Sequence, residues 1–183
     1  MMNSIVILTF SGRNEGNCAN ISNYLMDYHK RTSIRNYTIH NLTPCGNCNY
    51  ECLKPSQTCP ELSAEYTEVM DSVCSSDLVY FVVPNYCGFP CAAYFSFNEH
   101  SVGYFNMDKQ IMERYLSVKK RFIIVSNTEN PEFKSAMQQQ TTEEPDILYL
   151  KTSKYRKQSI AGDMMDAIEA KTDLKSFLDA YKP

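Results

Sequence analysis

The fold is decided by residues 5–17, IVILTFSGRNEGN. The first six of them are nearly all apolar and rich in β-branched side chains, which predicts a buried β-strand. A polar turn follows, and apolar residues then recur at the spacing of an amphipathic helix, with Asn17 at the expected N-cap. Such a turn gathers free backbone N–H groups and the positive helix end at one point. Together with Arg13, it is predicted to bind a phosphate.

The turn contains neither G-x-G-x-x-G nor G-x-x-x-x-G-K-[ST], the patterns of the dinucleotide fingerprint and of the nucleotide triphosphate loop. By itself it is equally compatible with an ordinary strand-to-helix loop. The choice between the two depends on the rest of the chain.

Length, charge and hydropathy restrict the class of protein. The 183 residues suit a single domain, 1–183. A net charge of −3 and only one short basic cluster predict no nucleic-acid and no membrane partner. Apolar runs are too short to span a bilayer, and the N-terminus lacks the pattern of a signal peptide. The protein is therefore predicted to be cytoplasmic.

Four further strands are predicted, and helical patterns lie between them. This alternation predicts an α/β fold in which a doubly wound, five-stranded parallel sheet carries helices on both faces. In such sheets ligands bind outside the carboxyl ends of the strands, so the loops after the first, third and fourth strands are predicted to form one site. The further strands are predicted at 34–40, 77–83, 121–126 and 146–150.

The third strand is predicted to stop at Pro84. An irregular loop is expected after it, with Pro90 as the first residue of the next helix. A third polar loop, 127–130, follows the fourth strand, and Pro131 is expected to begin a helix.

Three segments together resemble the flavodoxin-like NAD(P)H-dependent FMN reductases, a family that includes iron-sulfur flavoproteins. They are SGRNEGN after the first strand, PCGNCNYECLKPSQTC after the second, and DLVYFVVPNYCGFPCA at the third. The likeness covers about residues 4–130 and is weaker beyond. The family's first turn usually reads like GSPRKNGNT, so Phe10 stands here in place of a glycine and Cys18 in place of a hydroxyl residue.

The resemblance implies a bound FMN that takes a hydride from NAD(P)H and passes electrons to a small-molecule acceptor such as a quinone or a flavin. In this chemistry the flavin is the reactive group, so no catalytic side chain is predicted. The residues implied to surround FMN are Ser11, Arg13, Gly16, Asn17 and Cys18 at the phosphate, Pro84, Asn85, Tyr86, Cys87 and Gly88 along the ring, and Ser126, Asn127 and Thr128 at its other edge.

Four cysteines, Cys45, Cys48, Cys52 and Cys59, fall within a loop, 44–60, that is inserted after the second strand. Four thiolates at such spacing can bind a [4Fe–4S] cluster or a zinc ion. The iron-sulfur flavoproteins carry a similar motif with one residue fewer in the middle gap. Free thiols that hold the loop or form reversible disulfides are the third alternative.

Other functions stay open at this point. A flavodoxin-type electron carrier, a thiol-redox protein acting through Cys45 and Cys48, and a non-catalytic module with the same fold are the rivals.

A basic run near the end of the chain suits either a nicotinamide 2′-phosphate or a solvated loop. The histidines His29, His40 and His100 are predicted to be structural or superficial. Aromatic residues beyond the needs of a small core predict a homodimer interface. The basic run is Lys151, Lys154, Arg156 and Lys157, and the aromatic residues are Tyr94, Phe95, Phe97, Tyr104 and Phe105.

Overall fold

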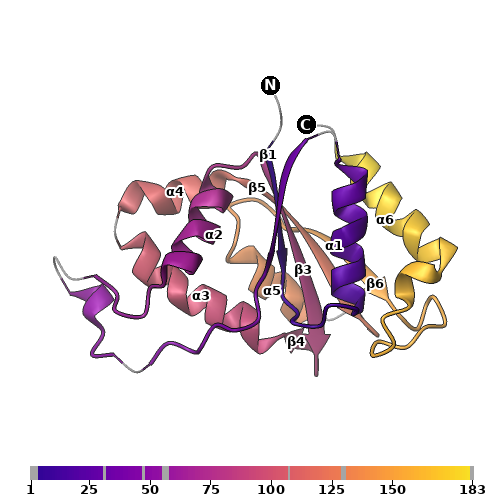
Figure 1. Ribbon diagram of the computed structural model, residues 1–183, viewed down its shortest axis with the longest axis horizontal. Coiled ribbons are helices and arrows are strands. Elements are labelled where there is room, and N and C mark those ends of the chain that lie inside the picture. Colours follow the sequence, from indigo (N-terminus) through magenta and orange to yellow (C-terminus); the bar gives the residue numbers. More distant parts are fainter. Residues whose placement is uncertain are drawn as a thin grey trace.

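The computed structural model describes residues 4–30, 32–46, 48–54, 58–106, 108–128 and 131–181. Within them a parallel sheet has helices on both faces (Figure 1). The parallel strands run in the order β2-β1-β3-β5-β6, which is the flavodoxin-like order, so the predicted fold class is confirmed. They are β1 (Ser4–Thr9), β2 (Ser33–Thr38), β3 (Leu78–Tyr86), β5 (Lys119–Ser126) and β6 (Asp146–Lys151).

The helices form two layers that bury opposite faces of the sheet (Figure 1). Along β3, Tyr80 and Val82 pack on the side of α1 and α6, whereas Phe81 and Val83 pack on the other side. This double burial explains the unbroken apolar run of β3. In the described residues no helix is both long and apolar enough to cross a bilayer. The helices are α1 (Asn17–Tyr28) and α6 (Ile168–Ala180) on one face, and α2 (Ala64–Cys74), α3 (Ala92–Phe105), α4 (Lys109–Ser117) and α5 (Pro131–Gln138) on the other; two 3₁₀ turns are η1 (Glu51–Leu53) and η2 (Met164–Asp166).

The prediction that β3 stops at Pro84 is wrong. Pro84 lies in register with Val125 of β5, while the pairing of β3 with β1 ends at Val82. Since backbone groups alternate in direction along a strand, the missing N–H of Pro84 faces the side where β1 has already ended and costs no hydrogen bond.

A tight hairpin replaces the irregular loop that was expected after β3. Tyr86 pairs with Phe89 of the short antiparallel strand β4 (Phe89–Pro90). The two residues of the turn, Cys87 and Gly88, have φ values of 53° and 92°, as a type I′ turn requires. Pro90 therefore belongs to β4, and helix α3 begins at Ala92 with Cys91 as its N-cap.

Three of the five aromatic residues predicted for a homodimer interface lie in the core of the chain itself. Tyr94, Phe97 and Tyr104 are buried on α3. The rings of Tyr94 and Phe97 meet Phe10 edge-on, with centroids 5.5 and 5.6 Å away. Helical spacing on α3 turns these rings toward the sheet, so they cannot contact a second subunit, whereas Phe95 is 45% exposed.

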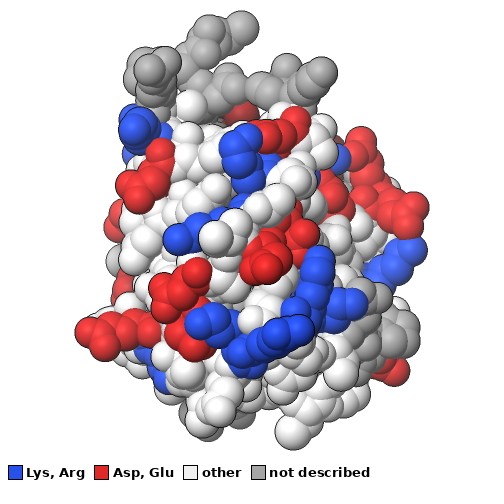
Figure 2. Space-filling model, turned by 90° about the vertical axis from the view of Figure 1, so that its right-hand side faces the viewer, with Lys and Arg blue, Asp and Glu red and all other residues white. Residues whose placement is uncertain are grey.

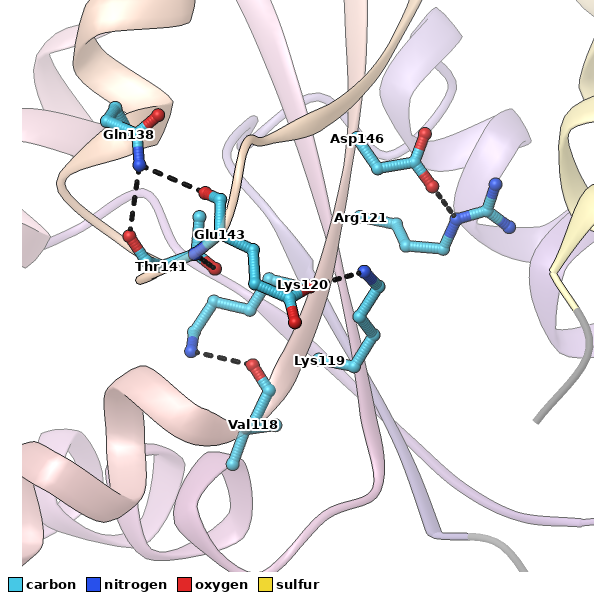
Figure 3. Close-up of polar contacts among 8 residues, drawn as sticks. All are labelled: Val118, Lys119, Lys120, Arg121, Gln138, Thr141, Glu143 and Asp146. Carbon is cyan, nitrogen blue, oxygen red and sulfur yellow. Dashed lines mark hydrogen bonds and ion pairs between the residues drawn. The ribbon is translucent and has the colours of Figure 1, made fainter.

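Two consecutive cations at the start of β5, Lys120 and Arg121, are buried on opposite faces of the sheet (Figure 3). Arg121 donates from Nε to Asp146 at 2.6 Å. Lys120 is 2% exposed and donates from Nζ to the carbonyl oxygens of Tyr115 and, at 3.1 Å, of Val118, where α4 ends. Burial disfavours the charged form and lowers the pKa of Lys120 to about 8.

The buried Lys120 predicts a pH-dependent stability difference between the wild type and Lys120→Met. Between pH 8 and the normal lysine pKa of 10.5, the unfolded chain holds the proton that folded Lys120 has lost. The cost of burying the charge is therefore complete below pH 8 and disappears as pH rises to 10.5. The free energy of urea unfolding of the wild type, relative to the variant, should rise by roughly 3 kcal/mol across this range. A difference that does not change with pH would contradict this assignment.

Candidate functional site

A cleft of about 470 Å³ opens at the carboxyl edge of the sheet, where the chain leaves β1 and β3. Its volume is in the range of small-molecule and cofactor sites. The turn after β1 forms one wall, and β4 with the start of α3 forms the other. The lining residues are Phe10, Ser11, Gly12, Arg13, His40, Tyr86, Pro90, Cys91, Ala92 and Ala93.

The first wall is the polar turn that was predicted to bind a phosphate. Ser11 Oγ accepts the backbone N–H of Arg13 at 3.4 Å, and the N–H of Gly16 returns to the Arg13 carbonyl at 3.2 Å. At Gly12 a Cβ atom would lie 2.8 Å from His40 Cδ2. The absence of a side chain at residue 12 thus allows the turn to lie directly against the end of β2.

A segment near the end of the chain, residues 159–164, packs against this turn, and we call it the strap. Arg13 donates from Nη2 to the Ile160 carbonyl at 2.6 Å. The Asn17 amide donates to the Ser159 carbonyl at 3.1 Å and accepts the N–H of Met164 at 3.0 Å. With its amide used in this way, Asn17 is the first residue of α1 rather than the N-cap, which is Gly16.

The strap approaches the turn so closely that it requires a glycine. Gly162 has a φ of 74°, and a Cβ atom there would lie 2.2 Å from the Glu15 carbonyl oxygen. Any side chain at this position would push the strap away from the turn. The sequence carries no spacing signal for this contact, because its two sides are far apart along the chain.

The second and third predicted loops are joined by a side-chain hydrogen bond. Asn85 donates from Nδ2 to Ser126 Oγ at 2.6 Å, and its Oδ1 accepts the N–H of Gly88 at 2.8 Å. Asn127 is held from the other side by Thr152, whose hydroxyl donates to its amide oxygen. Asn85 thereby attaches the hairpin, which carries Tyr86, to the end of β5.

The structure brings some of the predicted site residues to the cleft and leaves others beside it. Ser11, Arg13 and Tyr86 line it. Cys18 does not, because its thiol is buried against the sheet, and burial raises the pKa of that thiol to about 12. The other predicted residues, Gly16, Asn17, Pro84, Asn85, Cys87, Gly88, Ser126, Asn127 and Thr128, support the walls or lie next to them and are not among the lining residues.

Seven lining residues were not among the predicted site residues: Phe10, Gly12, His40, Pro90, Cys91, Ala92 and Ala93. Of these, His40 had been assigned a structural or superficial role. Its position gave a usable signal, since it follows the second strand and so had to arrive at the same sheet edge. A separate cavity of about 230 Å³ lies on its other side, between the end of β2 and α2, and Tyr37, His40 and Tyr66 are among its lining residues.

The four cysteines predicted as metal ligands do not form a ligand set in the structure. In the part of the chain that the structure describes, no three His, Cys, Asp or Glu side chains are placed to hold a metal ion. Cys45 and Cys48 are partly exposed, whereas Cys52 and Cys59 are buried.

The basic run after β6 is partly neutralised by neighbouring carboxylates. Lys154 pairs with Asp173, and Lys157 lies 3.2 Å from Asp163. Figure 2, which views the molecule from the side of α6, shows basic and acidic side chains intermingled on this face. This arrangement favours the solvated loop over a dedicated phosphate site.

No family model and no curated protein matches the sequence. Solved structures do match the fold. A putative quinone reductase from Klebsiella pneumoniae aligns with a TM-score of 0.62 at 11% identity, over 98% of this chain and 85% of its own. The flavoenzyme FerB, an NAD(P)H:(acceptor) oxidoreductase from Paracoccus denitrificans, aligns with a TM-score of 0.58 at 11% identity, over 97% and 96%. Trp repressor binding protein from Bacillus subtilis aligns with a TM-score of 0.62 at 12% identity, over 98% and 100%. At these identities the likeness shows the fold.

Asn17 is predicted to hold the strap on the first turn. In Asn17→Ala the buried N–H of Met164 and the Ser159 carbonyl lose their partner, so the free energy of unfolding should fall by about 2 kcal/mol. Chemical denaturation measures the change. Asn14→Ala, in the exposed part of the same turn, is the matched control and should change stability by less than about 0.5 kcal/mol. Equal effects of the two substitutions would show that the strap contact contributes nothing.

Proposed function

We propose that this chain is an FMN-dependent oxidoreductase that uses NAD(P)H to reduce a small-molecule acceptor, such as a quinone or a flavin. The observation that carries the proposal is the cleft at the ends of β1 and β3. The polar turn that leads into α1 forms one wall with Ser11, Gly12 and Arg13, and Tyr86 with two alanines forms part of the other. A ligand with a phosphate tail and a flat apolar ring matches both walls.

The turn suits the phosphate end of such a ligand. Backbone N–H groups near the start of α1 and the positive end of that helix attract an anion. Arg13 uses one N–H for the strap, and a guanidinium has five N–H donors, so the remaining donors can reach a phosphate while the strap keeps the side chain in place.

The hairpin suits the ring end. Tyr86 is 59% exposed and offers an aromatic face over the cleft, and Ala92 and Ala93 leave room beside it. Asn85 holds the hairpin in place. Bound FMN would supply the hydride-accepting chemistry, so the chain has to bind it, orient its ring and leave one face open. The solved structures with this fold include a putative quinone reductase and an NAD(P)H:(acceptor) oxidoreductase, which agrees with this class of reaction.

Three further predictions accompany the proposal without carrying it. A [4Fe–4S] cluster or zinc ion at Cys45, Cys48, Cys52 and Cys59 rests on spacing, and no electron-transfer step is assigned to it. A homodimer stays a prediction; of the five aromatic residues named for its interface, Phe95 is exposed and Phe105 is partly buried. The cytoplasmic location rests on the sequence.

Titration with FMN and with riboflavin tests the phosphate end of the cleft. Arg13→Met should weaken FMN binding about tenfold, the effect of losing one charge-assisted contact, and should leave riboflavin binding unchanged. Arg156→Met, which removes an exposed arginine of the basic run, is the matched control and should bind FMN as the wild type does. Equal weakening of both ligands in Arg13→Met, or no FMN binding by the wild type, would refute the assignment.

Steady-state oxidation of NADH or NADPH tests the proposed reaction. With FMN and a benzoquinone the wild type should turn over many times, whereas a mere electron carrier would be reduced once and stop. Tyr86→Ala should lower kcat/KM at least fivefold because one wall of the ring site is lost. Tyr50→Ala, which removes an exposed tyrosine of the cysteine loop, should not. Failure of the wild type to turn over would exclude the enzyme.

A further inference from the structure

The cysteine loop is docked on α3 at several points, away from the cleft. The N–H of Cys45 donates to a carboxylate oxygen of Glu99 at 3.0 Å. His100 donates from Nε2 to the Thr43 carbonyl at 2.9 Å, and Asn106 donates to the Cys52 carbonyl. The loop is thus held against the second half of α3, whereas the start of that helix lines the cleft.

Gly103 of α3 marks the place where two cysteine side chains press on the helix. A Cβ atom at residue 103 would lie 2.6 Å from Cys59 Cβ, 2.9 Å from Cys59 Sγ and 3.9 Å from Cys52 Cβ. A glycine inside a helix costs about 1 kcal/mol relative to alanine. Its presence is explained by this close approach, which seats Cys52 and Cys59 next to the same point.

Burial divides the four thiols into two pairs. The inner pair, Cys52 and Cys59, is buried, and both side chains lie beside Gly103. The outer pair, Cys45 and Cys48, is partly exposed. Burial, together with the neighbouring thiols, raises the pKa values of Cys45 and Cys52, so both carry their protons at neutral pH. Cys52 and Cys59 also raise the pKa of Cys45, and Cys48 also raises that of Cys52. The outer and the inner pair therefore lie near each other.

We propose that Cys52 and Cys59 form a reversible disulfide that is reached by thiol–disulfide exchange through Cys45 and Cys48. The oxidant is a low-molecular-weight disulfide of the glutathione type. One such molecule oxidises the outer pair to a disulfide and leaves as two thiols. The inner pair then reduces the outer disulfide, so that Cys45 and Cys48 regain both protons and Cys52 and Cys59 share the new S–S bond.

The exposure of the two pairs supports this order. The outer pair has the C-x-x-C spacing of dithiol redox sites and meets solvent, so its thiols can reach and attack a disulfide in solution. The inner pair is buried beside α3, so a disulfide in solution reaches it less readily than it reaches the outer pair. No residue of this group lines the cleft, so the inference does not depend on flavin binding.

Equilibration of the full chain in buffers of reduced and oxidised glutathione tests the proposal. After acid quenching, unfolding and alkylation with N-ethylmaleimide, the intact mass should show the loss of two of the eight alkylated thiols as the buffer becomes oxidising. Peptide mapping without reduction should then show a link between Cys52 and Cys59. Cys45→Ser should reach the same end point at least tenfold more slowly, and Cys74→Ser, a buried cysteine of α2, should behave as the wild type.

Three results would overturn the proposal. The first is alkylation of all eight thiols in every buffer, and the second is a link that involves other cysteines, such as the exposed Cys87. The third is one equivalent of zinc, or an iron-sulfur cluster, held by these four cysteines in protein purified without oxygen. Each of these results is measured on the wild-type protein. The proposal can therefore be decided even if a variant fails to fold.

Discussion

The parallel pairing of β1 with β2 on one side and with β3 on the other is the constraint on which the site depends. From β1 the chain turns through α1 toward β2, and from β3 it turns through α3 toward β5. Because α1 and α3 lie on opposite faces of the sheet (Figure 1), neither covers the ends of β1 and β3. A cleft opens there for topological reasons, and side chains only determine what fits into it.

The strap gives this cleft a fixed shape. Arg13 lies within the turn after β1 and Asn17 directly follows it, and each is hydrogen-bonded to residues 159–164. An exposed turn would otherwise lose conformational entropy when a ligand orders it, and a turn that is already held loses less. The geometry of a site near the N-terminus thus depends on a segment close to the C-terminus, with Gly162 at the point of closest approach.

The sequence was sufficient for the sheet because buried parallel strands keep an unbroken apolar character. It was insufficient to tell which aromatic residues of α3 are buried, because exposed Phe95 lies directly beside buried Tyr94. The hairpin was missed because Cys87 adopts a positive φ that side chains rarely take. The polar turn and Tyr86 were found from their places after strands. The strap could not be found, since nothing local in the sequence records a contact across the whole chain.

A crystal structure of the chain grown with FMN tests the central claim most directly. The account predicts the phosphate within hydrogen-bond distance of backbone N–H groups in residues 12–17 and of Arg13, and the ring between Tyr86 and the start of α3. An FMN ring in the cavity between β2 and α2, or an empty cleft at saturating FMN, would contradict it.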